Sequence, residues 1–324
     1  MKYFIIVLVA SVIIHGSLSI DSLRFLVIGD MGGMDIEPYT TYFQRCTAQE
    51  MGKIGDLYSP QFIVELGDNF YMDGVDNVHD KRFNLTFEST YTATSLQVPW
   101  YLVAGNHDHR GNVTAQILYS QYSKRWNFPS FYYYQEFSIG TGNQTLGIVF
   151  VDTVLLCGNV SDTSDQPPNE PENKEAANQQ WEFIENALKK SRASYLFVAG
   201  HYPIYSTATH GPTKCLVDRL QPMLDMYRAN GYFAGHDHNL QHLRIKSISG
   251  GNIDYFVSGM ANTVDPFSFN EGSVPAGSSL FHYGYFLSKG GFLYAEATNA
   301  NITMIFIDGN GKQLYSTIVF PRKL

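Results

Sequence analysis

Five continuous apolar runs in this chain each end at a glycine that is followed by polar residues. The runs read LRFLVIGD, QFIVELGD, WYLVAGNHD, YLFVAGHY and YFAGHDH. Runs rich in Val, Ile, Leu and Phe, without alternation of polar residues, are typical of strands that are buried on both faces. We therefore expect five interior strands whose polar loops meet at the edge where the strands end.

Helical stretches separate these strands and predict helices at 41–57, 115–126, 174–191 and 215–230. Alternating strands and helices indicate an α/β fold, assigned to α+β in some schemes. Residues 243–320 differ, because glycine turns separate short apolar runs such as GGFLYAEAT and ITMIFID. This pattern predicts an antiparallel section near the end of the chain.

The composition is that of a folded protein with a large core. Of the 324 residues, 44% are hydrophobic and 16% are charged, which argues against disorder. Neither an internal repeat nor a linker interrupts the chain, so we expect one domain over residues 20–324. The net charge of −8 argues against nucleic-acid binding, because no basic surface is available to displace counterions.

The first 19 residues have the features of a secretory signal peptide. Lys2 precedes an apolar run that extends to Ile14, and small residues at 17 and 19 form a cleavage site. No later segment is long enough to cross a bilayer. We therefore expect a secreted or lysosomal protein whose mature form has no membrane partner. Five N-x-S/T sequons agree with this route, at Asn84, Asn112, Asn143, Asn159 and Asn301.

The polar residues that follow the five glycines supply seven metal-binding groups. They are Asp30, Asp68, Tyr71, Asn106, His201, His236 and His238. Seven groups exceed the needs of one tetrahedral site, and two ions bridged by one carboxylate account for them. Asp68 is the expected bridge. Pairs of ions suit displacement at phosphorus, because they stabilise both the attacking and the leaving oxygen.

Tyr71 indicates that one of the two ions is Fe(III). A phenol has an unperturbed pKa of about 10, so only a strongly acidic ion keeps it deprotonated at low pH. Fe(III) also acidifies bound water more than a divalent ion does, so hydroxide survives in acid. The predicted Fe(III) ligands are Asp30, Asp68, Tyr71 and His238. The predicted ligands of the second, divalent ion are Asp68, Asn106, His201 and His236.

The motifs GDMGG, GDNFY, GNHD, GHYPIYS and GHDHNLQ resemble the five metal-binding blocks of the metallophosphoesterases. Tyr71 within GDNFY narrows the resemblance to the purple acid phosphatases. The stretches GNVTAQILYS, HGPTKCLVDRL and FHYG are similar to the small, tartrate-resistant type, and the resemblance covers nearly the whole mature chain.

This resemblance implies a four-layer α/β/β/α sandwich, with two mixed sheets flanked by helices. It implies Fe(III) paired with Fe(II), or with zinc in some members. It also implies a disulfide between Cys157 and Cys215. The number of cysteines, three, by itself predicts one disulfide and one free thiol. Cys46 falls within a predicted helix, and we expect it to be a small buried apolar residue.

The expected activity is hydrolysis of phosphate monoesters, with a metal-held hydroxide as nucleophile and inorganic phosphate as product. Nothing in the chain selects one ester, so aryl phosphates, nucleotides and phosphoproteins are all expected substrates. His107 and His210 match the substrate-side histidines of the family, and either one protonates the leaving group. Asp108 is expected to orient a neighbour. Structural or supporting roles are expected for His79, His109, His242 and His282.

Three alternatives stay open at this stage. One is a divalent-metal phosphodiesterase or Ser/Thr-type phosphatase on the same fold, against which Tyr71 argues. Another is a binding protein with a vestigial site, although all seven groups are present. The third is a side reaction in which redox-active iron generates oxygen radicals.

The polar segment 158–173 is either a regulatory loop, through Asp162 and Asp165, or an inert linker. The oligomeric state is unknown, with a monomer favoured.

Overall fold

The computed structural model describes residues 22–161 and 168–323. The predicted signal peptide therefore lies outside the described residues, as do Asp162 and Asp165. Within the described ranges, no helix combines the length and the apolar character that crossing a membrane requires.

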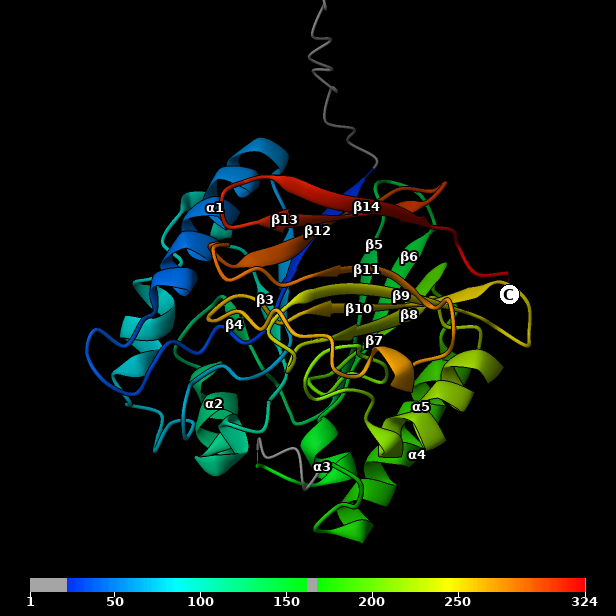
Figure 1. The fold of residues 1–324 in the computed structure, drawn as a ribbon, viewed down its shortest axis with the longest axis horizontal. Coiled ribbons are helices and arrows are strands. Elements are labelled where there is room, and N and C mark those ends of the chain that lie inside the picture. Colours follow the sequence, from blue (N-terminus) through cyan, green and yellow to red (C-terminus); the bar gives the residue numbers. More distant parts are fainter. Residues whose placement is uncertain (1–21, 162–167, 324) are drawn as a thin grey trace, which may run out of the picture.

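Two seven-stranded sheets form the centre of the molecule (Figure 1). The first contains β1 Leu23–Ile28, β2 Phe62–Glu65, β3 Trp100–Leu102, β4 Trp126–Asn127, β12 Gly291–Ala297, β13 Ile302–Asp308 and β14 Gln313–Val319. Its strand order is β14-β13-β12-β1-β2-β3-β4. Strands β1 to β4 are parallel, and β12 to β14 extend the sheet in antiparallel fashion.

The second sheet contains β5 Tyr133–Ser138, β6 Thr145–Phe150, β7 Tyr195–Ala199, β8 Gly231–Ala234, β9 Leu240–Lys246, β10 Asn252–Ser258 and β11 Ser279–Tyr283. Its order is β11-β9-β10-β8-β7-β6-β5. The four strands β6, β7, β8 and β10 are parallel, and β5, β9 and β11 pair antiparallel at the two sides.

In the described part of the chain, five α-helices cover the outer faces of the two sheets. They are α1 Tyr42–Tyr58, α2 Val113–Tyr119, α3 Thr153–Cys157, α4 Lys174–Lys190 and α5 Lys214–Met226. Short helical turns occur at Phe83–Glu88, Thr94–Leu96, Asp108–Arg110 and Glu271–Ser273. Figure 1 shows α1 and α2 on one side of the molecule, and α4 and α5 on the other.

Three apolar cores separate the four layers. Phe25 and Val27 of the first sheet face Phe197 and Phe233 of the second. The outer face of the first sheet packs against Met51 of α1 and its neighbours, and the outer face of the second packs against α3, α4 and α5. All six residues of β1 are buried, as the continuous apolar run predicts. The predicted four-layer α/β/β/α sandwich is confirmed.

The two longest helices, α1 and α4, begin and end within one residue of the bounds predicted from the sequence. The Thr41 side chain accepts the N–H of Gln44 at the start of α1, which satisfies one of the free donors of the first turn. In α4, Ala177, Trp181, Ile184 and Leu188 are buried at helical spacing, so one stripe faces the sheet.

Two predicted helices are shorter in the structure. The predicted helix 115–126 ends at Tyr119, because Trp126 belongs to β4 and the carbonyl of Arg125 accepts the N–H of Trp100. The predicted helix 215–230 ends at Met226, because Arg228 adopts a left-handed backbone with φ of 52°.

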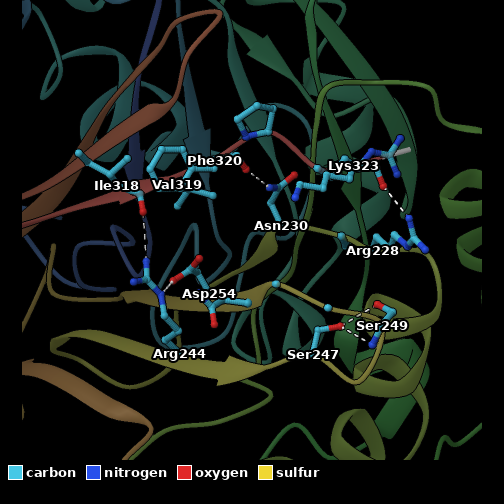
Figure 2. A pocket seen from close by; sticks show the side chains of 16 residues that line it. Arg228, Asn230, Arg244, Ser247, Ser249, Asp254, Ile318, Val319, Phe320 and Lys323 are labelled. Atoms are coloured by element: carbon cyan, nitrogen blue, oxygen red, sulfur yellow. Dashed lines mark hydrogen bonds and ion pairs between the residues drawn. The ribbon is translucent and has the colours of Figure 1, made fainter.

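The predicted antiparallel section is present but is divided between the two sheets. Strands β9 and β11 complete the second sheet, whereas β12, β13 and β14 complete the first. The end of the chain is then tied to the second sheet. The Asn230 amide donates to the carbonyl of Phe320, and the Arg228 guanidinium donates to that of Lys323. Figure 2 shows these contacts beside a cavity of about 380 Å³.

Candidate metal centre

Three of the predicted ligands share an unusual backbone conformation at the ends of parallel strands. Asp30 follows β1, Asp68 follows β2 and His236 follows β8, with φ of 60°, 56° and 69°. A left-handed conformation is uncommon for residues other than glycine and often marks functional sites. All three residues are buried. The tight turns direct their side chains back across the edge where the two sheets meet.

Tyr71 lies among the groups that were predicted to surround Fe(III). Its phenol oxygen is 3.0 Å from Oδ1 of Asp30 and 2.9 Å from Nε2 of His238. Nε2 of His238 is itself 3.4 Å from Oδ1 of Asp30. The ring of Tyr71 packs edge-on against that of His107, with centroids 4.5 Å apart. The phenol thus points at the carboxylate and the imidazole rather than away from them.

A second cluster joins His201, Asn106 and Asp68. Nε2 of His201 lies 2.9 Å from Oδ1 of Asn106 and 3.5 Å from Oδ2 of Asp68. The other ring nitrogen, Nδ1, lies 2.9 Å from the carbonyl of Leu66. When Nδ1–H donates to that carbonyl, Nε2 of the neutral ring presents a lone pair. Three lone-pair donors then converge, which is the arrangement that a cation stabilises.

The donor set therefore fits a buried metal site. Suitable ligand atoms of Asp30, Asp68 and His201 lie within 4.8 Å of one another in a buried position. Burial, followed by the nearby Asp30 and Asp68 carboxylates, raises the pKa of the Tyr71 phenol well above its usual value. Burial and the rings of His210 and His201 hold the pKa of His236 well below its usual value. His236 is therefore neutral, the form that binds metals.

The two predicted substrate-side histidines lie beside these clusters. Nδ1–H of His107 donates to the carbonyl of Met72 at 2.5 Å, and its Nε2 lies 3.9 Å from Oδ2 of Asp68. The His210 ring stacks on that of His236, with centroids 4.0 Å apart. A cavity of about 370 Å³ is lined by Asp68, Tyr71, His107, His210, His236 and His238. All nine predicted residues thus lie at or beside one cavity.

A second cavity, of about 480 Å³, shares His210 and His236 with the first. Ser161 and Pro168 also line it, and these two residues belong to the segment 158–173. The Arg110 guanidinium donates to the carbonyl of Val160 at 2.6 and 2.8 Å, and so holds the start of this segment near the site.

The other predicted residues have simpler positions. Cys157 and Cys215 form the disulfide that the resemblance implies, with Cα atoms 5.7 Å apart. Cys46 is a free, half-buried thiol in α1, so the expectation of full burial was wrong. Among the sequon asparagines, three are exposed: Asn84, Asn112 and Asn143. The other two, Asn159 and Asn301, are half-buried.

Two of the remaining histidines have carboxylate partners. Nε2 of His109 lies 2.7 Å from Asp152, and Nε2 of His242 lies 2.7 Å from Asp254. These buried contacts agree with the structural roles that the sequence predicts for them.

The structure adds two supporting carboxyl groups that the sequence did not single out. Asp237 accepts the backbone N–H of His210 at 3.0 Å. Glu65 is fully buried at the end of β2 and accepts the N–H of Gly67 at 2.8 Å. Asp237 could have been found, because it lies between the two histidines of GHDH. Glu65 lies within an apolar run, where a charged residue is itself a signal.

Two facing sheets bring carboxylate, phenol, amide and imidazole groups together at the ends of their parallel strands. This arrangement is that of a metal-dependent phosphoesterase. The family model described as calcineurin-like phosphoesterase matches residues 23–240. Tartrate-resistant acid phosphatase type 5 of Oryctolagus cuniculus is 46% identical, with 91% of this chain and 90% of that protein covered. The Homo sapiens protein of the same name is 44% identical, with 93% and 92% covered.

Among solved structures, the purple acid phosphatase PPD1 from yellow lupin (Lupinus luteus) seeds superposes with a TM-score of 0.62 at 17% identity. The match covers 92% of this chain and 54% of the lupin chain. The chain belongs to the calcineurin-like phosphoesterases and, within them, to the acid phosphatases of the purple, tartrate-resistant type, which are hydrolases. The resemblance read from the motifs is therefore confirmed.

Proposed function

We propose that the protein hydrolyses phosphate monoesters at acidic pH with an Fe(III)–M(II) pair, in which M is Fe(II) or, alternatively, Zn(II). The observation that carries this proposal is the position of the Tyr71 phenol, 3.0 Å from Asp30 and 2.9 Å from His238. Asp30, Asp68, Tyr71 and His238 would hold Fe(III). Asp68, Asn106, His201 and His236 would hold the divalent ion.

When bound, such a pair supplies positive charge for the phosphoryl group and lowers the pKa of water. The side chains of the protein supply the remaining functions. His107, held by its Nδ1–H bond to the Met72 carbonyl, directs Nε2 into the cavity. His210 is positioned by Asp237. Either ring can protonate the departing alkoxide, a step worth about 10²–10⁴ in rate.

The proposed substrates are phosphate monoesters, including aryl phosphates, nucleotides and phosphoproteins, and the product is inorganic phosphate. The proposed location is the secretory route, either extracellular or lysosomal, with residues 1–19 as a cleaved signal and 20–324 as the catalytic domain. The five sequons are proposed glycosylation sites, and the working form is a monomer.

The segment 158–173 is proposed to regulate the site. The support is that Ser161 and Pro168 line a cavity that also contains His210 and His236. Cleavage of this segment would then alter access to the substrate side of the site. Turnover measured before and after limited proteolysis tests this role, and unchanged kinetics after complete cleavage would remove it.

Metal analysis combined with a visible spectrum of the purified protein tests the main proposal. Phenolate-to-Fe(III) charge transfer should colour the protein violet, and Tyr71→Phe should abolish the band. Tyr122→Phe, at an exposed tyrosine, is the matched control and should retain it. A colourless wild-type protein with full activity and only divalent ions would instead favour a divalent-metal phosphodiesterase or Ser/Thr-type phosphatase.

A further inference from the structure

Five exposed apolar side chains gather on two neighbouring loops. One loop follows β10 and the other follows β11 (Figure 1). The exposed fractions are 46% for Phe267, 71% for Phe269, 53% for Tyr285, 63% for Phe286 and 77% for Leu287. We call this set the aromatic rim. Single exposed apolar residues are common, but a gathered set marks an interaction site.

Three of the four rings of the aromatic rim contact one another. Phe267 stacks on Phe269 with centroids 4.8 Å apart, and the edge of Phe286 meets Phe267 at 6.0 Å. The backbones of the two loops also meet, because a Cβ on Gly284 would lie 2.1 Å from the Asp265 carbonyl oxygen. Two segments that are distant in sequence thus present a single apolar surface.

In the loop after β10, the part that carries Phe267 and Phe269 is held on both sides by backbone contacts. The N–H of Asp265 donates to the carbonyl of His238 at 2.7 Å. The Asn270 N–H donates to the carbonyl of Thr207 at 2.9 Å, and its amide donates to that of Ala208 at 2.7 Å. Phe267 and Phe269 therefore lie between a bond to His238 and bonds to the segment before His210. Asn270, next to Phe269, lines the cavity that also contains His210 and His236.

Exposed apolar residues also occur in two other loops at the cavity beside the candidate metal centre. Met72, which lines the cavity, is 45% exposed, and Ile36, two residues after the cavity-lining Met34, is 66% exposed. Exposed apolar side chains therefore occur on several of the loops around the metal site. A surface that contacts them would lie directly over the cavity.

The charges around the cavity favour one kind of occupant. Asp265 and Glu271 are the acidic residues of segment 264–290, and Lys289 is its single lysine or arginine. Asp35 also lines the cavity. Acidic groups repel an anionic membrane. They complement the quaternary ammonium groups that cover a phosphatidylcholine surface, and aromatic rings attract the same groups.

We propose that the aromatic rim docks on a zwitterionic lipid surface and that the adjacent site hydrolyses phosphate monoesters carried by lipids. This inference rests on the proposed phosphatase function. Water adds to phosphorus, the P–O bond to the lipid alcohol breaks, the alcohol leaves with a proton, and inorganic phosphate forms. The expectation of no membrane partner was based only on the lack of a membrane-spanning segment. Contact with a lipid surface through loop side chains does not require such a segment.

Vesicle flotation of the holoenzyme tests the proposal. The probe is a phosphatidylcholine vesicle that contains a few mole per cent of phosphatidic acid. The test variant replaces Phe269, Phe286 and Leu287 by Ser. The control is Ile248→Ser, which changes a side chain that is 96% exposed. Ile248 lies in the turn before β10. The length of β10, about 20 Å, separates this turn from the loop after β10 that carries part of the aromatic rim.

The wild type and Ile248→Ser should float with the vesicles, and the triple variant should lose about tenfold or more in partitioning. Release of phosphate from vesicle-borne phosphatidic acid should fall in parallel. Hydrolysis of soluble p-nitrophenyl phosphate should stay within about twofold in all three proteins, because the rim holds no proposed ligand. If the triple variant does not fold, Leu287→Ser alone carries the test.

A wild type that stays in the aqueous phase would overturn the docking surface, as would a folded variant that floats equally well. A wild-type dimer in sedimentation velocity that the triple variant converts to monomer would assign the rim to self-association instead. Failure of the proposed function has a different signature. In that case the vesicles still bind the protein, but neither phosphatidic acid nor p-nitrophenyl phosphate is hydrolysed.

Discussion

Oδ2 of Asp108 accepts the backbone N–H of Asn69 at 3.0 Å and the side-chain amide of the same residue at 3.2 Å. The same oxygen accepts the N–H of Gly105 at 2.8 Å. The loop that carries Asp68 and Tyr71 is thereby tied to the loop that carries Asn106. This agrees with the expected orienting role of Asp108.

Replacing Asp108 by Ala should release these loops and lower stability. Each buried N–H left without an acceptor costs roughly 1–3 kcal/mol, so we expect the free energy of unfolding to fall by about 3 kcal/mol or more. Metal content should fall as well. Denaturant titration and metal analysis measure both. The control is Asp73→Ala, at a side chain that is 75% exposed, and it should change neither the stability nor the metal content. Wild-type stability and metal content in Asp108→Ala would show that Asp108 does not hold the two loops together.

Gly105 should not tolerate even a methyl group. A Cβ at this position would lie 2.2 Å from Oδ1 of Asp68 and 2.4 Å from its backbone nitrogen. Since Asp68 is the proposed bridge, Gly105→Ala should displace it and lower kcat/KM for p-nitrophenyl phosphate by about 100-fold. Gly272→Ala is the matched control, because no atom lies within 4 Å of its added Cβ. Wild-type kinetics for Gly105→Ala would show that the loops of Gly105 and Asp68 can move apart without loss of activity.

The predicted site came from local signals, which explains why it could be found in the sequence. A buried strand, a glycine and a polar residue define where each group emerges. Asp30, Asp68 and His236 then meet because parallel strands end at the same edge. Apart from the expected orienting role of Asp108, however, the sequence does not say how each side chain is held. The bonds of Asp108 to Asn69 and of Asp237 to His210 follow no local pattern.

The missed parts of the fold depend on pairing between distant segments. Strand β1 pairs with β12, so Leu23 lies opposite Ala297, and no periodicity predicts such a partner. The hairpin of β5 and β6 was not predicted. The hydrophobic pattern of residues 243–320 also did not indicate that the strands of this section are divided between two sheets. Register and partner choice arise from packing across the whole core rather than from the pattern along one strand.

Loss of the Cys157–Cys215 disulfide should reduce stability by an amount set by the chain it encloses. The cysteines are 58 residues apart, and in the chain-entropy model a loop of this length is worth about 4 kcal/mol. The double substitution to Ser should lower the free energy of unfolding by roughly that amount. Cys46→Ser, at the free half-buried thiol, should have a small effect. Equal unfolding midpoints for the two variants would contradict this assignment.

The pair formed by His109 and Asp152 should make stability depend on pH. Nε2 of His109 is 2.7 Å from Oδ2 of Asp152, and Oδ1 of Asp152 accepts the N–H of Leu155 at the start of α3. Burial lowers the pKa of His109, but the Asp152 carboxylate, with Asp108 and Glu172 nearby, raises it, and the pKa lies above its usual value.

A histidine whose pKa is raised on folding stabilises the protein fully below its unfolded pKa of about 6.5. This contribution is lost as pH rises through the raised folded value. A double-mutant cycle with His109→Gln and Asp152→Asn should therefore give a coupling of about 1–3 kcal/mol at pH 5.5 and less at pH 9. The Asn retains an oxygen that can cap α3. His79→Gln, at an exposed histidine, should change stability by less than about 0.5 kcal/mol. A coupling that is equal at the two pH values would show that the contact does not depend on a charged imidazole.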